Sequence, residues 1–120
     1  MAHTGLMAAL ERKGADIDGI MARFLRDEAL YADCLQEFVR DENFEALKTA
    51  IAIGDYPRAF ECAHALKGVA GNLGLVPLYR AVGDITDALR AKRYDALDSL
   101  YPSVIFNRDA FLSVISQQIR

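Results

Sequence analysis

The sequence predicts an all-α fold, an antiparallel up-and-down four-helix bundle with one or two short accessory helices at its N-terminus. Apolar residues recur every three or four positions along nearly every segment, the spacing that gathers them on one face of a helix. No stretch shows the alternation of apolar and polar residues that a half-buried strand requires. The connections between the periodic segments are short, which favours antiparallel neighbours.

The accessory helices are predicted in the first quarter of the chain. Residues 1–15 have a weak apolar pattern that ends at Gly14, so we expect an N-terminal extension or a short helix there, and residues 16–120 form the main domain. Asp16 can cap a second short helix that ends near residue 25. The side chains expected to face inward are Leu6, Met7 and Leu10 in the first segment and Ile17, Ile20, Met21 and Phe24 in the second.

Two helices follow, over residues 27–40 and 42–53. Asp27 can cap the first, and Gly54 can end the second because glycine readily adopts the left-handed conformation of a helix stop. The buried stripes expected on these helices are Leu30, Cys34, Leu35 and Phe38 on the first and Phe44, Leu47 and Ile51 on the second.

The next two helices are predicted to form an antiparallel hairpin. Asp55 can cap the first, which ends near Gly74 and has Pro57 in its first turn, where a missing N–H costs nothing. Pro77 stands in the first turn of the second helix. The residues of this second helix expected to face the core are Leu78, Val82, Ile85 and Leu89.

The last segment runs from Tyr94 onward and contains Pro102. Because proline lacks a backbone N–H and its ring clashes with the preceding turn, we expect a kink there or a division into two helices. The apolar stripe of this segment consists of Leu97, Leu100, Val104, Phe111 and Ile115.

Composition excludes several classes of function. Of the 120 residues, 52% are hydrophobic and 26% charged, which is typical of one folded, soluble domain. The net charge of −3 and the absence of a long basic run argue against nucleic acid as a partner. No apolar stretch approaches the roughly 20 residues that span a bilayer, and no secretory pattern opens the chain. We therefore expect a cytoplasmic protein that does not contact a membrane.

The two cysteines do not indicate a metal site. Cys34 and Cys62 form no Cys-x-x-Cys pair, and we expect both to be small buried thiols. A zinc site would need both of them together with His3 and His64, yet Cys62 and His64 lie two positions apart on one predicted helix and point to nearly opposite sides. We expect no bound metal and no cofactor.

One polar stripe stands out on the helix predicted after Asp55. His64, Lys67, Gly68 and Gly71 occur at i, i+3, i+4 and i+7 and so share one face. A glycine inside a helix forgoes roughly 0.5–1 kcal/mol relative to alanine, so two of them on an exposed face indicate a reason other than stability. Close approach of a partner to the imidazole is one such reason. The opposite, apolar stripe is Ala59, Ala63, Leu66, Ala70 and Leu73.

Phosphoryl transfer is the chemistry that suits this stripe. An ordinary imidazole, with a pKa of about 6.5, is mostly neutral at pH 7 and can act as a nucleophile. Acyl transfer would need an oxyanion hole and a hydroxyl or thiol nucleophile, which no neighbour of His64 supplies. Phosphoryl transfer needs in-line access and charge stabilisation, which Gly68, Gly71 and Lys67 can provide.

Other readings of the same residues remain open. His64 can be an ordinary surface histidine, and the two glycines can permit close helix packing instead of partner access. Phe60, one turn before His64, can belong to the edge of the core or to a docking surface. Asp84 and Asp87 fit a solvated helix face better than a catalytic pair.

A family resemblance lies in the run His64-x-Leu66-Lys67-Gly68-x-Ala70-x-x-Leu73-Gly74, with the pair Gly71-Asn72 inside it. This run resembles the signature of histidine-containing phosphotransfer (HPt) domains, the shuttles of multistep two-component phosphorelays. The resemblance covers about residues 16–118. It implies a four-helix bundle whose histidine accepts a phosphoryl group on Nε2 from the aspartate of a response-regulator receiver domain and passes it to another receiver.

The resemblance also implies roles for individual residues. His64 is then the phosphoacceptor and Lys67 the charge partner, while Phe60, Gly68, Gly71 and Asn72 belong to the surface on which a receiver docks. The Mg²⁺ used in transfer belongs to the receiver. The receivers expected as partners include those of hybrid sensor kinases. No ATP-binding element is visible, so the resemblance implies a phosphocarrier without autokinase activity.

Two positions depart from the family pattern. Val69 stands where a serine or alanine is common. Thr86 stands where many members have a Gln or Glu that bonds the second ring nitrogen of the histidine, so Thr86 orients the ring through water, or Asp87 or Arg90 takes over this role. Two other functions remain alternatives: a helical adaptor that binds receivers without being phosphorylated, and a phosphatase that discharges them.

Overall fold

The structure is a computed structural model that describes residues 5–118, so His3 lies outside the described residues. All regular secondary structure within these residues is helical, as predicted. The helices are α1 (Gly5–Arg12), α2 (Ile17–Arg23), α3 (Glu28–Val39), α4 (Asn43–Ile53), α5 (Tyr56–Asn72), α6 (Val76–Arg90), the 3-10 turn η1 (Tyr94–Ala96) and α7 (Leu97–Gln118).

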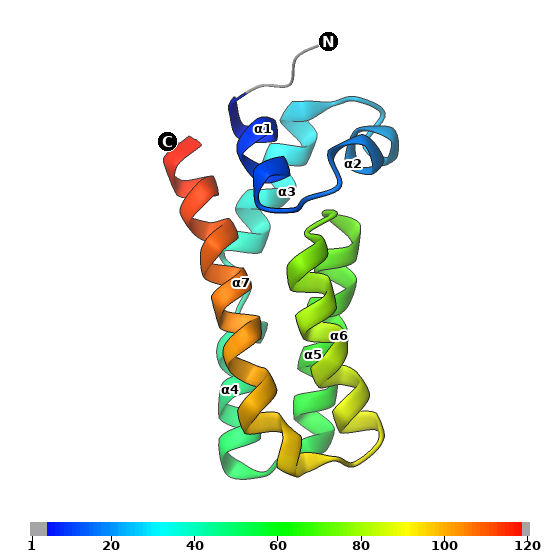
Figure 1. The fold of residues 1–120 in the computed structure, drawn as a ribbon, viewed down its shortest axis with the longest axis vertical. Helices are drawn as coiled ribbons and strands as arrows, with labels where there is room; N and C mark the ends of the chain where they lie inside the picture. Colours follow the sequence, from blue (N-terminus) through cyan, green and yellow to red (C-terminus); the bar gives the residue numbers. More distant parts are fainter. Residues whose placement is uncertain (1–4, 119–120) are drawn as a thin grey trace.

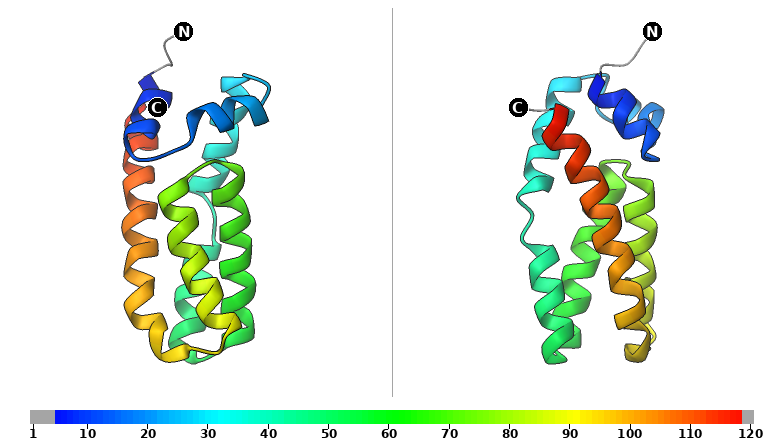
Figure 2. Two further views of the ribbon diagram at one scale, coloured as in Figure 1. Left: turned by 45° about the vertical axis from the view of Figure 1, so that its right-hand side comes forward. Right: turned by 60° about the vertical axis from the view of Figure 1, so that its left-hand side comes forward.

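The helices form an elongated bundle that measures 47 × 25 × 20 Å (Figure 1). Helix α5 packs between α4 and α6, and α6 packs against α7. The segments α3 and α4 follow one another along one side of the bundle, so that together they take the place of one long helix (Figure 2). The short helices α1 and α2 lie across one end, where α1 packs on α7 and α2. None of the helices in residues 5–118 has the length and apolarity to cross a bilayer.

Local capping sets the helix boundaries where the sequence predicts them. The side chains of Asp16, Asp27 and Asp55 each accept a hydrogen bond from a backbone N–H three residues later, at 3.1, 2.9 and 3.2 Å. Gly54 ends α4 in the left-handed conformation with a φ of 73°. Pro77 stands in the first turn of α6, as predicted.

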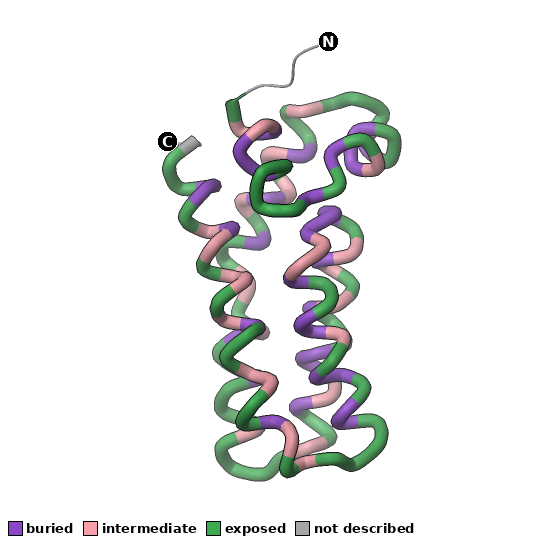
Figure 3. The backbone as a smooth tube through the Cα atoms, in the orientation of Figure 1, coloured by how far each residue is buried: buried purple, intermediate pink, exposed green. Residues whose placement is uncertain are grey.

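The core runs along the inward sides of the helices (Figure 3). Nearly all the apolar stripes predicted from periodicity are buried, including Met7 and Leu10 of α1, which therefore forms a packed helix rather than a loose extension. Leu6, Cys34, Ile51 and Leu100 are only partly buried and pack against this core.

The stripe predicted for α3 is wrong at its first position. Leu30 is 48% exposed, while the adjacent Tyr31 is fully buried. The Tyr31 hydroxyl donates a 2.7 Å hydrogen bond to the backbone carbonyl of Leu73, which compensates for burying the polar end of the ring. Burial raises the pKa of Tyr31, and the nearby positive charge of Arg23 opposes this effect. Periodicity alone favoured burial of Leu30 over Tyr31, because leucine has no polar group to satisfy. The pattern does not show that the Tyr31 hydroxyl has a buried hydrogen-bond partner.

Of the two alternatives expected at Pro102, a kink or a division, the division does not occur, because α7 continues through this residue. In an unbroken helix, Pro102 leaves the carbonyl of Asp98 without its usual N–H donor. Asp98 lies in the exposed first turn of α7, where water can satisfy that carbonyl. The break occurs earlier instead, at the junction between η1 and α7.

The N-terminal segments satisfy the backbone at the carboxyl end of α5. One guanidinium nitrogen of Arg23 donates to the carbonyls of Gly71 and Asn72, at 3.1 and 2.6 Å. The backbone N–H of Asp16 donates to the carbonyl of Gly74 at 3.0 Å. A cation at this end of a helix also complements the helix dipole. The segment from Asp16 to Tyr31 thus fixes the end of the helix that carries His64.

Candidate functional site

The predicted polar stripe lies on α5, where it meets α6. Helix α5 turns Ala59, Cys62, Ala63, Leu66 and Ala70 toward the core. His64 stands in the middle of this helix on the other side and is exposed. We call the surface around it the His64 face. It comprises Phe60, His64, Lys67, Gly68 and Gly71 of α5 and Tyr79, Gly83, Asp87 and Arg90 of α6.

Contacts between α5 and α6 fix the register of this face. Gly71 lies against the Tyr79 ring, Lys67 lies against Gly83, and Phe60 lies beneath the guanidinium of Arg90. The two helices run antiparallel, so each step backward along α5 is matched by an equal number of residues forward along α6. His64 is therefore level with Thr86.

The imidazole of His64 is held by a ring contact. It stacks on Phe60 with ring centroids 5.9 Å apart and an interplanar angle of 15°. Phe60 is partly buried and packs against the core, so it is both the edge of the core and a part of the His64 face. Within residues 5–118, no hydrogen bond to the His64 ring is formed.

Thr86 lies level with the histidine but is turned inward. Its side chain is fully buried, and its hydroxyl donates a 2.8 Å hydrogen bond to the carbonyl of Val82, four residues earlier on α6. The hydroxyl proton is thus used within α6. The ring contact of His64 within residues 5–118 is the one with Phe60.

Arg90 and Asp87 form an exposed ion pair beside Phe60. The guanidinium of Arg90 lies 3.1 Å from the Asp87 carboxylate and 5.5 Å from the centroid of the Phe60 ring. Such a pair at an exposed site contributes about 0–1 kcal/mol to stability. Its structural effect is to place a cation against the ring that stacks on His64, whereas Asp84 stays on the solvated side of α6.

The Lys67 ammonium is on the same face as His64 but turned away from it. Its Nζ atom lies 5.5 Å from the centroid of the Tyr79 ring. Tyr79 lies opposite Gly71, one turn beyond Lys67 along α5, so the positive charge points away from the imidazole.

The two glycines of the stripe differ in their surroundings. A Cβ atom added at Gly68 would have nothing within 4 Å, so this position is open to solvent. A Cβ atom added at Gly71 would lie 3.0 Å from Cε1 and 3.1 Å from Cδ1 of Tyr79. Gly68 thus leaves room beside the histidine, while Gly71 allows close packing of the Tyr79 ring on α5.

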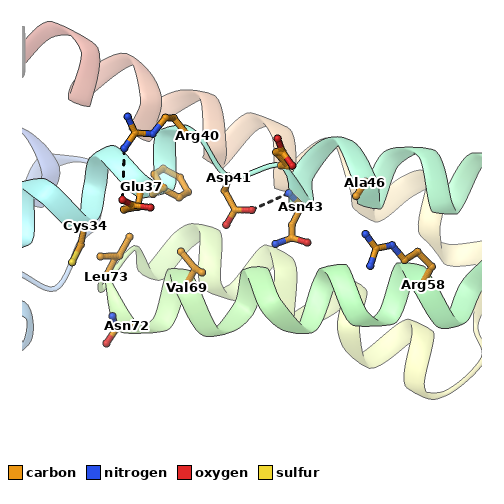
Figure 4. A pocket seen from close by; sticks show the side chains of 12 residues that line it. Cys34, Glu37, Arg40, Asp41, Asn43, Ala46, Arg58, Val69, Asn72 and Leu73 are labelled. Atoms are coloured by element: carbon orange, nitrogen blue, oxygen red, sulfur yellow. Dashed lines mark hydrogen bonds and ion pairs between the residues drawn. The ribbon is translucent and has the colours of Figure 1, made fainter.

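A hollow in the surface lies on another side of α5. It has a volume of about 660 Å³ and lies between α5 and the break from α3 to α4 (Figure 4). Asn72 and Val69 line it, whereas His64 does not. Some of its charged groups have partners: Arg40 pairs with Glu37 at 3.6 Å, and Asp41 accepts a 2.8 Å hydrogen bond from the backbone of Asn43. Asn72 thus lines this hollow, and it also stands one turn beyond Gly68 along α5.

The thiols are not gathered into a site. Cys62 is buried, which raises its pKa, and Cys34 is partly buried at the hollow. Among residues 5–118, no three His, Cys, Asp or Glu side chains come close enough together to hold a metal ion.

Sequence reasoning missed Tyr79 and Arg23. The hairpin register contained a signal for Tyr79, because a tight turn centred on Leu75 places residues equally distant from it, such as Gly71 and Tyr79, side by side. The role of Arg23 had no such signal, because its contact with α5 joins segments that are far apart in the chain.

A comparison with protein-family models matches residues 30–114 to the Hpt domain. The match begins within α3, ends within α7 and excludes α1 and α2. The other two comparisons found no similar curated protein and no similar solved structure.

Proposed function

Because this chain belongs to the Hpt domain family, which serves histidine phosphotransfer in two-component signalling, we propose that His64 accepts a phosphoryl group from one receiver domain and passes it to another. The observation that carries the proposal is an exposed imidazole at the middle of α5 with open space at Gly68, one turn away. This geometry gives an incoming phosphorus atom a free path.

The transfer step needs little from this chain beyond the imidazole. The Nε2 lone pair attacks the phosphorus of the receiver's aspartyl phosphate, the new N–P bond forms, and the O–P bond breaks with its electron pair left on the aspartate carboxylate. The proton on Nδ1 stays on the ring or passes to water. The second transfer reverses these steps onto the aspartate of the next receiver. Mg²⁺ is expected in the receiver's acidic pocket, so this chain needs no metal of its own.

The convex site supports a partner protein as the source of the phosphoryl group. A small-molecule kinase site would enclose its nucleotide in a cleft, whereas His64 lies on the outside of a helix and does not line the hollow beside α5. Contact with a receiver would exclude water from the His64 face and strengthen the attraction between Lys67 and the phosphoryl group. The chain is therefore proposed to be a carrier without autokinase activity.

The proposal is tested by asking which donor, ATP or a phosphorylated receiver, transfers radiolabelled phosphate to the chain. Incubated with radiolabelled ATP alone, the full chain should remain unlabelled. Incubated with a phosphorylated receiver from the same cell, it should become labelled, and the label should be lost in acid and kept in base, as expected of a phosphoramidate bond. Labelling by ATP alone, or release of phosphate by the receiver without a labelled intermediate, would contradict the carrier function.

Substitution of Gly68 should separate the access of a receiver to His64 from the stability of the fold. Gly68→Ala and Gly68→Gln both remove the flexibility of glycine in a helix, so each should raise the free energy of unfolding by roughly 0.5–1 kcal/mol, measured by urea denaturation. Phosphoryl transfer from a receiver should fall only slightly for alanine and at least about tenfold for glutamine, whose side chain fills the space beside His64. Equal transfer rates for the two variants would show that the open space is not used.

A further inference from the structure

The contact between Lys67 and Tyr79 is unexpected at a site that handles a phosphoryl group. The stem of Lys67 crosses α6 at Gly83, where an added Cβ would lie 3.8 Å from the lysine Cε. The charge then ends over the Tyr79 ring, 5.5 Å from its centroid. The cation expected to serve His64 is therefore bound elsewhere in the unphosphorylated protein.

The Tyr79 ring is firmly placed to receive this charge. It lies against Gly71, where an added Cβ would stand 3.0 Å from the ring, so a larger residue would require the ring to shift by a few tenths of an ångström. Tyr79 is 40% exposed, so the ring also meets solvent. The glycine of α5 and the tyrosine of α6 together form a fixed aromatic surface one turn from Lys67.

On the basis of the proposed function, we propose that Tyr79 is a positioning residue that holds the Lys67 ammonium away from His64 and releases it once His64 carries a phosphoryl group. A cation over an aromatic ring at an exposed site is held by a factor of about two to five in the equilibrium constant. The charges of a phosphoryl group attract the ammonium more strongly than a neutral ring does. The attraction of the Tyr79 ring is thus strong enough to hold the Lys67 ammonium in the unphosphorylated protein. It is also weak enough for a phosphoryl group on His64 to outcompete it.

This arrangement affects the direction of transfer. Because Tyr79 stabilises only the unphosphorylated state, it lowers the affinity of His64 for the phosphoryl group by the same factor. A carrier with this feature passes the group on more readily.

The resting contact is tested by NMR on the full chain. The ε-methylene protons of Lys67 should resonate upfield in the wild type because of the Tyr79 ring current. Tyr79→Phe keeps the ring and should keep the shift, whereas Tyr79→Leu should remove it. Circular dichroism of each variant checks that the helices are retained. Absence of the upfield shift in the wild type and in Tyr79→Phe would overturn the proposal while leaving the carrier function standing.

The release is tested with phosphoramidate as a chemical donor, whose P–N bond breaks with loss of ammonia as the bond to His64 forms. A ³¹P signal of phosphohistidine reports the modification. In the phosphorylated wild type, the Lys67 shift should move to its value in Tyr79→Leu, and an unchanged shift would overturn the proposal. A histidine that phosphoramidate does not modify would instead contradict the proposed function, and the release with it.

The effect on equilibrium is tested with a receiver. In Tyr79→Leu, the equilibrium constant for transfer from receiver to His64 should increase about two- to fivefold. In the Lys67→Met background, the same Tyr79 substitution should leave the constant unchanged, because the lysine it acts through is absent. An equal change in both backgrounds would show that Tyr79 acts independently of Lys67 and would overturn the proposal.

Discussion

Glutamine in place of His64 is expected to abolish labelling of the chain by a phosphorylated receiver, a loss of at least about a hundredfold and limited only by detection. Glutamine has no ring nitrogen with a free lone pair, so the N–P bond cannot form. Because His64 is exposed and none of the described residues hydrogen-bonds its ring, the substitution should leave the fold intact. Labelling measured with a radiolabelled receiver, together with circular dichroism, checks both statements.

A matched control and a binding assay sharpen this test. Lys48→Gln introduces the same residue at an exposed position of α4, away from the His64 face, and should label like the wild type. Binding of His64→Gln to the receiver should be retained, because the docking surface is otherwise unchanged. A variant that no longer carries phosphate but still supports signalling in cells would favour the helical adaptor. Labelling that survives the substitution would place the phosphoacceptor elsewhere.

Replacement of Leu10 by alanine is expected to lower the free energy of unfolding by about 2–5 kcal/mol, the usual cost of emptying a buried leucine site. Leu10 is completely buried on α1, which packs on α7 and α2. Helix α1 lies outside residues 30–114, so this result would show that the folded unit extends beyond the part that matches the family. Urea denaturation followed by circular dichroism measures the change.

Leu25→Ala provides the control for this experiment. It removes the same atoms from a side chain that is 88% exposed and should change stability by no more than about 0.5 kcal/mol. A single cooperative transition in both variants is expected, because the α1 side chains belong to the same core as the bundle. If Leu10→Ala were as mild as Leu25→Ala, α1 would not be an integral part of the fold.

The functions of the two stripe glycines could not be separated by sequence reasoning. Gly68 and Gly71 share the polar side of α5 and look equivalent on a helical projection. Only the packing of α6 shows that one faces open space and the other the Tyr79 ring. For Gly71, the reading as a helix-packing residue is therefore the one that the contacts support.

The sequence by itself determined most of the helix boundaries, the aspartate caps of α2, α3 and α5 and the exposure of His64. These properties depend on neighbours within about four residues, since a cap binds an N–H three positions away and a helical face repeats every 3.6 residues. The tertiary structure alone decided that Tyr31 rather than Leu30 is buried, that Arg23 binds the end of α5 and that Lys67 points toward Tyr79. Each of these depends on a partner from another helix, whose position follows from how the whole chain packs and not from any local pattern.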